Sequence, residues 1–228
     1  MMQSIVGLAT QWPYINDVCC LALLDSNPGW CATEAENLLS AAEKADGADK
    51  SSASYRAWLL GRLAGKAAAA EFWGIAPKQA EIVRHPDGWP KLNLPGGRTG
   101  CLSISHSAGA ALAVAANWPD RCGVDLERLD RPIVDKAWLW AFASEERELA
   151  ENAPPGEIPP RLALWCAKEA AAKAWGLGLL NHLAQVRATK ADWAAGMVDV
   201  TLADIGPVPV KLMIQGPYLV ALAKAGGF

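Results

Sequence analysis

The sequence predicts an α+β fold made of two similar halves that form a pseudo-dimer, residues 1–116 and residues 117–228. The first observation is an internal repeat: residues 66–74 align without gaps with residues 168–176, sharing a lysine, three alanines, a tryptophan and a glycine. The second is that a predicted antiparallel hairpin follows each copy. Alanine-rich helices also look alike by chance, so the alternative that the chain forms one larger domain stays open. A true repeat would place a ligand site at the seam of the halves.

Apolar runs alternate with turn-forming residues in the N-terminal half. Residues 17–24 are apolar and precede Asp-Ser-Asn-Pro-Gly, which predicts a strand followed by a turn. Apolar residues at helical spacing predict helices over residues 34–44 and 55–72. The remaining expected elements are a strand over residues 80–83, loops over residues 46–54 and 86–100, and a hairpin over residues 101–116 that turns near Ala108 and Gly109.

The C-terminal half follows the same reasoning. Residues 122–126 are apolar and predict a strand, and residues 136–152 have apolar residues on one side of a predicted helix. Four prolines in residues 153–160 predict a loop. The remaining expected elements are a helix over residues 162–175 and strands over residues 198–202, 208–214 and 218–225.

Composition narrows the class of protein. Hydrophobic residues make up 52% of the chain and charged residues 20%, which is ordinary for a globular protein. With a formal net charge of −3, no global basic field favours nucleic acid, so an anionic ligand needs a local basic cluster. No run of apolar residues is long enough to cross a bilayer, and we expect a cytoplasmic monomer. The six cysteines show no C-x-x-C spacing, which argues against a zinc site.

Three carboxylates are the candidates for metal binding. Asp125 and Glu127 would point to one face of a strand, roughly 6–7 Å apart, and would repel each other unless a cation lay between them. Glu169 lies one helical turn after Trp165, so we expect it to be half-buried and to need a partner. A shared Mg²⁺ would satisfy all three. The alternatives are ion pairs with nearby arginines and a helix pair between Glu169 and Lys173.

Two groups in the N-terminal half could bind a phosphate. His106 lies between two serines at the end of a predicted strand, although a lone histidine is more often structural. Arg62 and Lys66 are four residues apart on one predicted helix and would present two positive charges on one face. The alternative for this pair is an ordinary solvated face.

Together these segments resemble the 4′-phosphopantetheinyl transferases, specifically the larger Sfp-type group whose single chain forms a pseudo-dimer. The likeness covers residues 56–179 and combines four motifs in the family's order, each weak alone. They are the helix with Arg56 and Gly61-Arg62, then Ser103-Ile104-Ser105-His106-Ser107, then Gly123-Val124-Asp125-Leu126-Glu127, and then Trp165-x-x-Lys168-Glu169-x-x-x-Lys173-x-x-Gly176-x-Gly178. The segment Phe142-Ala143-Ser144-Glu145-Glu146 also resembles the family's Phe-x-Ser-x-Glu.

This resemblance implies a holo-[acyl-carrier-protein] synthase type of enzyme. Such an enzyme moves the 4′-phosphopantetheine arm of coenzyme A to a serine of an apo acyl or peptidyl carrier protein and releases 3′,5′-ADP. It implies that Asp125, Glu127 and Glu169 hold Mg²⁺ against the pyrophosphate of coenzyme A. Lys173 would contact the α-phosphate, and Glu169 would take the proton of the attacking serine.

The coenzyme contacts implied by the resemblance lie in the N-terminal half. Ser105 and His106 would bind the ADP portion, and Arg56 would reach the 3′-phosphate. Trp89 stands where the family usually has a lysine, which removes one expected cation and suggests stacking on adenine instead. The role of Lys168 stays open.

Two other readings remain. The chain could be a degenerate relative that binds coenzyme A or a carrier protein without catalysis, which the loss of a lysine at Trp89 favours mildly. It could also be a Mg²⁺-dependent nucleotide hydrolase, which would release product without a carrier. The sequence does not select among fatty-acid, polyketide and peptide carriers.

Overall fold

The computed structural model describes residues 10–11, 18–24, 35–117, 121–177, 183–202 and 205–224. The chain divides into two compact units, which we call unit 1 (residues 1–120) and unit 2 (residues 121–228). Each unit combines one antiparallel sheet with helices, so the predicted α+β class is confirmed. The turn expected after residue 24 lies outside the described residues.

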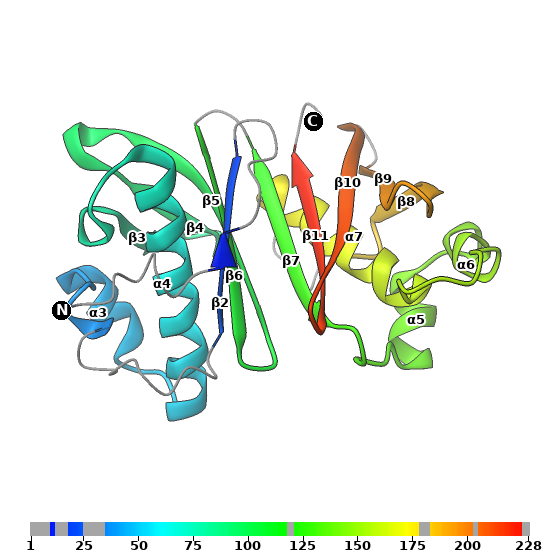
Figure 1. The fold of residues 1–228 in the computed structure, drawn as a ribbon, viewed down its shortest axis with the longest axis horizontal. Coiled ribbons are helices and arrows are strands. Elements are labelled where there is room, and N and C mark those ends of the chain that lie inside the picture. Colours follow the sequence, from blue (N-terminus) through cyan, green and yellow to red (C-terminus); the bar gives the residue numbers. More distant parts are fainter. Residues whose placement is uncertain are drawn as a thin grey trace. The chain divides into compact units, whose positions relative to one another are not determined.

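Unit 1 holds a six-stranded antiparallel sheet in the order β1-β2-β6-β5-β4-β3. Its helix α4 (Ser52–Trp73) packs against β2, β5 and β6, as Figure 1 shows. Two glycines allow this close packing, because a Cβ on Gly65 would meet Ile82 at 2.7 Å and one on Gly61 would meet Ile104 at 3.0 Å. The remaining described elements are β1 (Thr10–Gln11), β2 (Val18–Leu24), α3 (Ala41–Gly47), η1 (Pro77–Gln79), β3 (Glu81–Arg84), β4 (Pro90–Asn93), η2 (Pro95–Gly97), β5 (Thr99–Ser107) and β6 (Ala110–Asn117).

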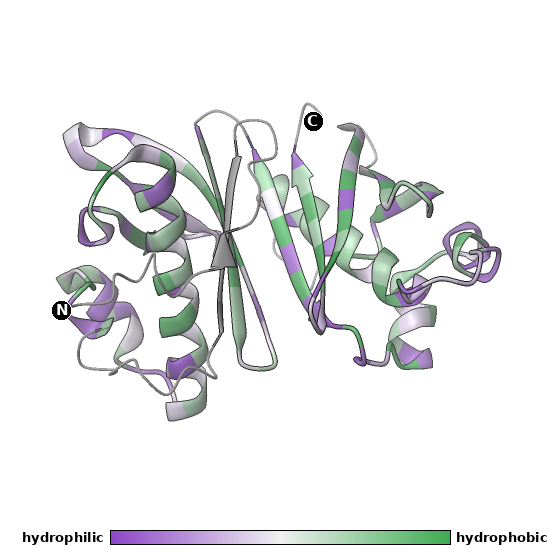
Figure 2. Cartoon of the chain, in the orientation of Figure 1, coloured by the Kyte–Doolittle hydropathy of each residue, from purple (hydrophilic) through white to green (hydrophobic). Residues whose placement is uncertain are grey.

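Unit 2 holds a five-stranded antiparallel sheet in the order β7-β11-β10-β9-β8. Helix α7 (Pro160–Ala174) packs against β7, β8, β10 and β11 through a row of buried alanines. Along β10 hydrophilic and hydrophobic residues alternate, which Figure 2 shows as bands. The elements are β7 (Cys122–Arg128), α5 (Asp135–Ala141), α6 (Ser144–Glu151), α7, β8 (Val186–Asp192), β9 (Met197–Leu202), β10 (Ile205–Gln215) and β11 (Tyr218–Lys224).

The two sheets share one topology. If β2 is matched to β7 and β3–β6 to β8–β11, the order β2-β6-β5-β4-β3 becomes the order β7-β11-β10-β9-β8. The long helices α4 and α7 follow the first of these strands in each unit. Two units of this kind are what the internal sequence repeat predicts.

The hairpin expected over residues 101–116 is confirmed, with Ser107 paired to Ala110 across the turn. Ala108 adopts the left-handed conformation there, with φ of 46°. The long helices also form, as Ser52–Trp73 and Pro160–Ala174. Gly74 ends α4 in the left-handed conformation that glycine favours, with φ of 61°.

Three predicted elements were wrong in part. The single helix expected over residues 136–152 is two helices, because Phe142 and Ala143 are extended and the side chain of Glu146 accepts the backbone N–H of Ala143 to begin α6. The helix expected over residues 34–44 is interrupted: residues 35–36 are helical, residues 37–39 form a turn, and the separate helix α3 begins at Ala41 after the capping box of Ser40 and Glu43. The loop expected over residues 86–100 contains strand β4.

Candidate active site

The two predicted acids of β7 lie on one face of that strand, as their spacing requires. Asp125 pairs with Ala221 and Glu127 with Leu219 of β11, and both acids are buried. Glu127 forms an ion pair with Arg131, four residues later. The guanidinium of Arg131 also lies 5.5 Å from the centroid of the Trp165 ring on α7. Glu127 is therefore held by a cation from its own loop.

Helix α7 brings the other two predicted residues to the same place. It can approach β7 closely because Gly123 has no side chain: a Cβ there would lie 2.0 Å from the carbonyl oxygen of Ala170 and 2.5 Å from the nitrogen of Ala174. Glu169 and Lys173 then reach the level of Asp125 from the helix. The close contact between the strand and the helix is what assembles the site.

Asp125, Glu169 and Lys173 form one buried cluster, which we call the acid–lysine cluster. Nζ of Lys173 donates a hydrogen bond of 2.7 Å to Oδ1 of Asp125 and lies 3.8 Å from Oε2 of Glu169. The pKa of Glu169 is raised to about 7, first by burial and then by the neighbouring Asp125 carboxylate. Burial, followed by the two carboxylates, also raises the pKa of the Cys166 thiol. Negative charge is therefore in excess at this point.

The donor atoms of this cluster suit a hard divalent cation. Two neighbouring buried carboxylates, one of which raises the pKa of the other, gain from a cation placed between them, and oxygen ligands are those that Mg²⁺ prefers. Among the described residues, however, no group of three His, Cys, Asp or Glu side chains is gathered as a ready metal site. Asp125 and Glu169 fit such an ion, whereas Glu127 would first have to leave Arg131.

Lys168 stands next to Glu169 in the sequence but does not join the cluster. Its side chain is fully buried and forms an ion pair of 2.9 Å with Glu146 of α6. The sequence alone did not indicate this partner. Glu146 belongs to the Phe-x-Ser-x-Glu segment, so the two motif segments contact each other within unit 2.

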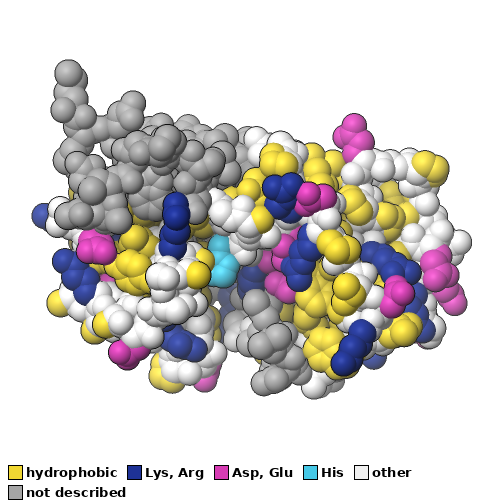
Figure 3. Space-filling view, turned by 90° about the horizontal axis from the view of Figure 1, so that it is seen from below, with side chains coloured by type: hydrophobic (Ala, Val, Ile, Leu, Met, Phe, Trp, Pro, Cys, Tyr) yellow, Lys and Arg dark blue, Asp and Glu magenta, His cyan; other side chains and the backbone are white. Residues whose placement is uncertain are grey.

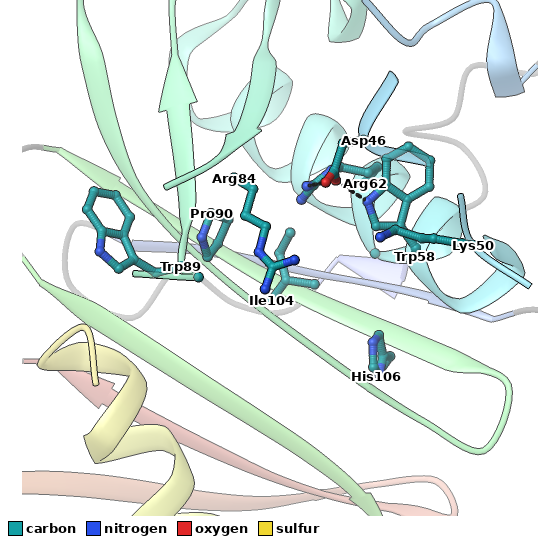
Figure 4. Close-up of a pocket in the computed structure, with 11 residues that line it drawn as sticks. Asp46, Lys50, Trp58, Arg62, Arg84, Trp89, Pro90, Ile104 and His106 are labelled. Carbon is teal, nitrogen blue, oxygen red and sulfur yellow. Dashed lines mark hydrogen bonds and ion pairs between the residues drawn. The ribbon is translucent and has the colours of Figure 1, made fainter. Parts of the chain in front are cut away.

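Unit 1 contains a pocket of about 230 Å³ between α3, α4 and the sheet. Asp46 joins two of the residues that line the pocket. Its Oδ2 accepts a hydrogen bond from Nε1 of Trp58 at 2.8 Å and another from Nη2 of Arg62 at 3.1 Å. Figure 4 shows this group on one side of the pocket and Arg84 and Trp89 on another. The pocket is lined by Asp46, Lys50, Trp58, Gly61, Arg62, Arg84, Gly88, Trp89, Pro90, Ile104 and His106. Four cationic or titratable basic side chains against one carboxylate suit an anion.

The coenzyme-binding residues expected in unit 1 are not all in this pocket. His106 lines it, but Ser105 is the next residue on β5 and its side chain points to the other face of the sheet. Arg56 is exposed near the start of α4 and does not line the pocket, whereas Arg62 does. Lys66, which was considered with Arg62 as a surface pair, is fully buried and pairs with Glu43 at 2.8 Å.

Trp89 lines the pocket, but its ring already has a partner. It stacks on His85 with the ring centroids 3.9 Å apart and the planes 15° apart. The two residues close a tight turn, in which the backbone N–H of His85 donates to the carbonyl oxygen of Trp89 at 2.9 Å. One face of the indole is thereby covered by the histidine.

On the face shown in Figure 3, the described acidic and basic side chains are interspersed, with no broad field of one sign. This agrees with the small net charge of −3.

No helix in the described part of the chain is both long enough and apolar enough to cross a bilayer.

The fold and the acid–lysine cluster together define unit 2 as an α+β domain with the groups that phosphate chemistry needs. Residues 121–223 match the sequence model of the 4′-phosphopantetheinyl transferase superfamily, and this stretch is therefore a domain of that superfamily. It is thus a transferase domain of the phosphopantetheinyl type. No curated protein matches the chain significantly.

Proposed function

We propose that this protein transfers the 4′-phosphopantetheine arm of coenzyme A to a serine of an apo acyl or peptidyl carrier protein, in the manner of the Sfp-type enzymes. The observation that carries this proposal is the buried acid–lysine cluster inside the matched domain. Its three members come from β7 and α7, which a glycine allows into contact. The cluster combines an acid with a pKa near neutrality and a lysine within hydrogen-bonding reach of a second acid.

Each residue of the cluster has a proposed role. Asp125 and Glu169 would hold Mg²⁺, with Glu127 as a third ligand once released from Arg131; bound there, the ion would neutralise charge on the pyrophosphate. Lys173 would donate to the α-phosphate oxygen and stabilise the charge of the departing 3′,5′-ADP. Glu169 would also accept the proton of the serine hydroxyl, directly or through a water.

The unit 1 pocket is proposed to bind phosphate of the coenzyme's nucleotide part. At about 230 Å³ it is smaller than pockets that enclose a whole drug-sized ligand, so it suits one portion of coenzyme A. Arg62 lines this pocket with Lys50 and Arg84, and its guanidinium is of the kind that binds phosphate oxygens. Arg62 thus joins His106 as a proposed phosphate ligand, while Arg56 and Ser105 remain proposals without support from the pocket.

The decisive experiment is to incubate the protein with coenzyme A, Mg²⁺ and a panel of apo carrier proteins, and to weigh the carriers by mass spectrometry. We expect one or more carriers to gain a phosphopantetheine group, with 3′,5′-ADP released in equal amount. A carrier whose acceptor serine is replaced by alanine is the matched control and should gain nothing. No gain with any carrier, while coenzyme A still binds, would favour the degenerate reading.

The hydrolase reading is separated by the same assay. If 3′,5′-ADP accumulates at the same rate without any carrier, water is the acceptor and the transferase proposal fails.

A further inference from the structure

The fully buried ion pair between Lys168 and Glu146 fixes the middle of α7 inside unit 2. Nζ of Lys168 lies 2.9 Å from Oε1 of Glu146, also donates to the carbonyl oxygen of Ala141, and lies 4.2 Å from the centroid of the Phe142 ring. All of these partners belong to the junction of α5 and α6. We call this set of contacts the lysine clamp.

Glu146 extends the clamp to the sheet. Besides Lys168, its Oε1 accepts the backbone N–H of Ala188 on β8 at 2.9 Å. Its Oε2 accepts from the backbone N–H of Ala143 at 2.8 Å and from Nη1 of Arg187 at 3.2 Å. One carboxylate therefore joins α6, α7 and β8, and both of its oxygens are occupied.

Unit 1 contains the same arrangement. Lys66 of α4 pairs with Glu43 at 2.8 Å and donates to the carbonyl oxygen of Ala80. Glu43 also accepts the backbone N–H of Ile82 on β3 at 3.2 Å and that of Ser40 at 2.8 Å. The glutamate again belongs to the short helix before the long one, and the strand is again the first of the four that follow the long helix. This second pair is a natural control for a purely structural role.

The two clamps differ in the residue that follows the lysine. In unit 1 it is the buried Ala67, and in unit 2 it is Glu169 of the acid–lysine cluster. Consecutive residues on a helix point about 100° apart. Lys168 therefore holds the side of α7 that faces α5, α6 and β8. The side chain of Glu169 extends from a different side of the helix, toward Asp125 on β7. Any rotation of α7 about its axis would move Glu169 relative to Asp125.

We propose that the Lys168–Glu146 pair is a positioning device for Glu169, holding α7 at the rotation that places this carboxylate beside Asp125. Lys168 thus acts through Glu169 and needs no contact with substrate. The proposal rests on the proposed transferase function for its kinetic consequences, but its structural consequence is independent of that function.

The test uses the double variant Lys168→Met with Glu146→Gln, because breaking only one side of a buried pair leaves an uncompensated charge that can prevent folding. Glutamine keeps one of the two acceptor oxygens, so one of the two backbone N–H groups that the glutamate binds loses its partner. Circular dichroism would verify that the variant folds. The matched control is Lys66→Met with Glu43→Gln, which removes the equivalent pair from unit 1. Both double variants should lose thermal stability to a similar degree.

The expected result is a split between the kinetic constants. The unit 2 variant should lose at least about tenfold in kcat, because small displacements of a catalytic group cost this much or more, with less than twofold change in KM for coenzyme A. The unit 1 control should keep kcat within twofold. A unit 2 variant that folds and also keeps kcat within twofold of the unaltered protein would overturn the proposal.

Two further readouts do not depend on transfer activity. A crystal structure of the unit 2 variant should show α7 rotated and Glu169 no longer beside Asp125, and Mn²⁺ binding followed by electron paramagnetic resonance should weaken at least tenfold only in that variant. An unmoved Glu169 in that crystal structure would contradict the clamp's role. If the unaltered protein transferred nothing to any carrier, the proposed function would fail, while the crystal structure would still decide about the clamp.

Discussion

Nζ of Lys173, in the last turn of α7, donates a hydrogen bond of 2.7 Å to Oδ1 of Asp125, in the middle of β7. The two residues are 48 positions apart in the sequence, and the side chains are almost completely buried, with exposed fractions of 13% and 2%. This bond places a cation directly against one of the two carboxylates of the cluster. Removing either partner therefore changes both charge balance and packing.

Replacing Lys173 by alanine should slow transfer more than it weakens coenzyme A binding. The lysine would act mainly on charge that develops as 3′,5′-ADP departs, so its loss should appear in kcat rather than in the dissociation constant. Single-turnover kinetics and calorimetric binding of coenzyme A would measure the two effects. Lys190→Ala, on an exposed part of β8, is the control. Equal losses in rate and binding would make Lys173 a docking residue only.

Replacing Glu169 by glutamine, or Asp125 by asparagine, should reduce transfer by about 10²–10⁴-fold while leaving the fold intact. These changes keep the size of each side chain but remove the negative charge that would hold Mg²⁺ and, at Glu169, the proposed proton acceptor. Circular dichroism would verify folding, and carrier mass would report transfer. Glu151→Gln, an exposed residue at the end of α6, should leave the rate unchanged. Near-normal transfer by either cluster variant at low Mg²⁺ would refute these assignments.

Without Mg²⁺, the stability of the protein should fall as the pH rises from about 4.5 to about 7, because the pKa of Glu169 is raised to about 7 in the folded protein from 4.5. Between these values the folded state holds a proton that the unfolded state has lost, so the free energy of unfolding decreases with pH. Urea unfolding at pH 5 and pH 8 would measure this. In Glu169→Gln this contribution should vanish, making the variant relatively more stable at pH 8. The same pH slope in both proteins would show that Glu169 does not titrate there.

Replacing Gly123 by alanine should destabilise the protein by about 1–3 kcal/mol or more, because the new Cβ would overlap the backbone of α7 at Ala170 and Ala174. Backbone atoms cannot rotate away as a flexible side chain can. Chemical denaturation would measure the loss. Gly206→Ala is the control, since nothing lies within 4 Å of a Cβ at that position. Equal stabilities of the two variants would mean that α7 can shift from β7 at little cost.

Replacing Arg62 by methionine should raise the dissociation constant for coenzyme A by roughly tenfold, as expected for one charge-assisted hydrogen bond. Arg56→Met should have a smaller effect, because Arg56 does not line the unit 1 pocket. Isothermal calorimetry with coenzyme A and with a coenzyme that lacks the 3′-phosphate would compare them. If Arg56→Met weakened binding more than Arg62→Met, the phosphate would be bound outside this pocket.

Much of the fold could be predicted from the sequence because local patterns were strong. The hairpin β5–β6 and strands β9–β11 follow from apolar runs separated by turns, and the long helices follow from 3.6-residue spacing. Strand β8 was missed because only Val186 and Ala188 of it are fully buried, and a register shift follows Ala188. Strand β4 was hidden by the prolines and glycines around it.

The candidate site was predictable only as a set of residue types. Asp125, Glu169 and Lys173 could be selected from motif spacing, and the structure gathers them. The ion pair of Glu127 with Arg131 is one of the alternatives that the sequence offered to a metal ligand. The burial of Lys66 and Lys168 could not be foreseen, because it depends on how separate elements pack. The pocket residues Lys50 and Arg84 carried no motif at all, and only the folded sheet and helices bring them near Arg62.

The contact between β7 and α7 consists of Gly123 against Ala170 and Ala174, with more buried alanines along the same helix. Laboratory evolution of this protein would find few acceptable mutations in that seam, since every larger side chain there separates the elements that carry the acids. Exposed residues such as Val134, Leu139 and Trp140 do not lie in this seam, so substitutions there should leave the contact between the strand and the helix intact.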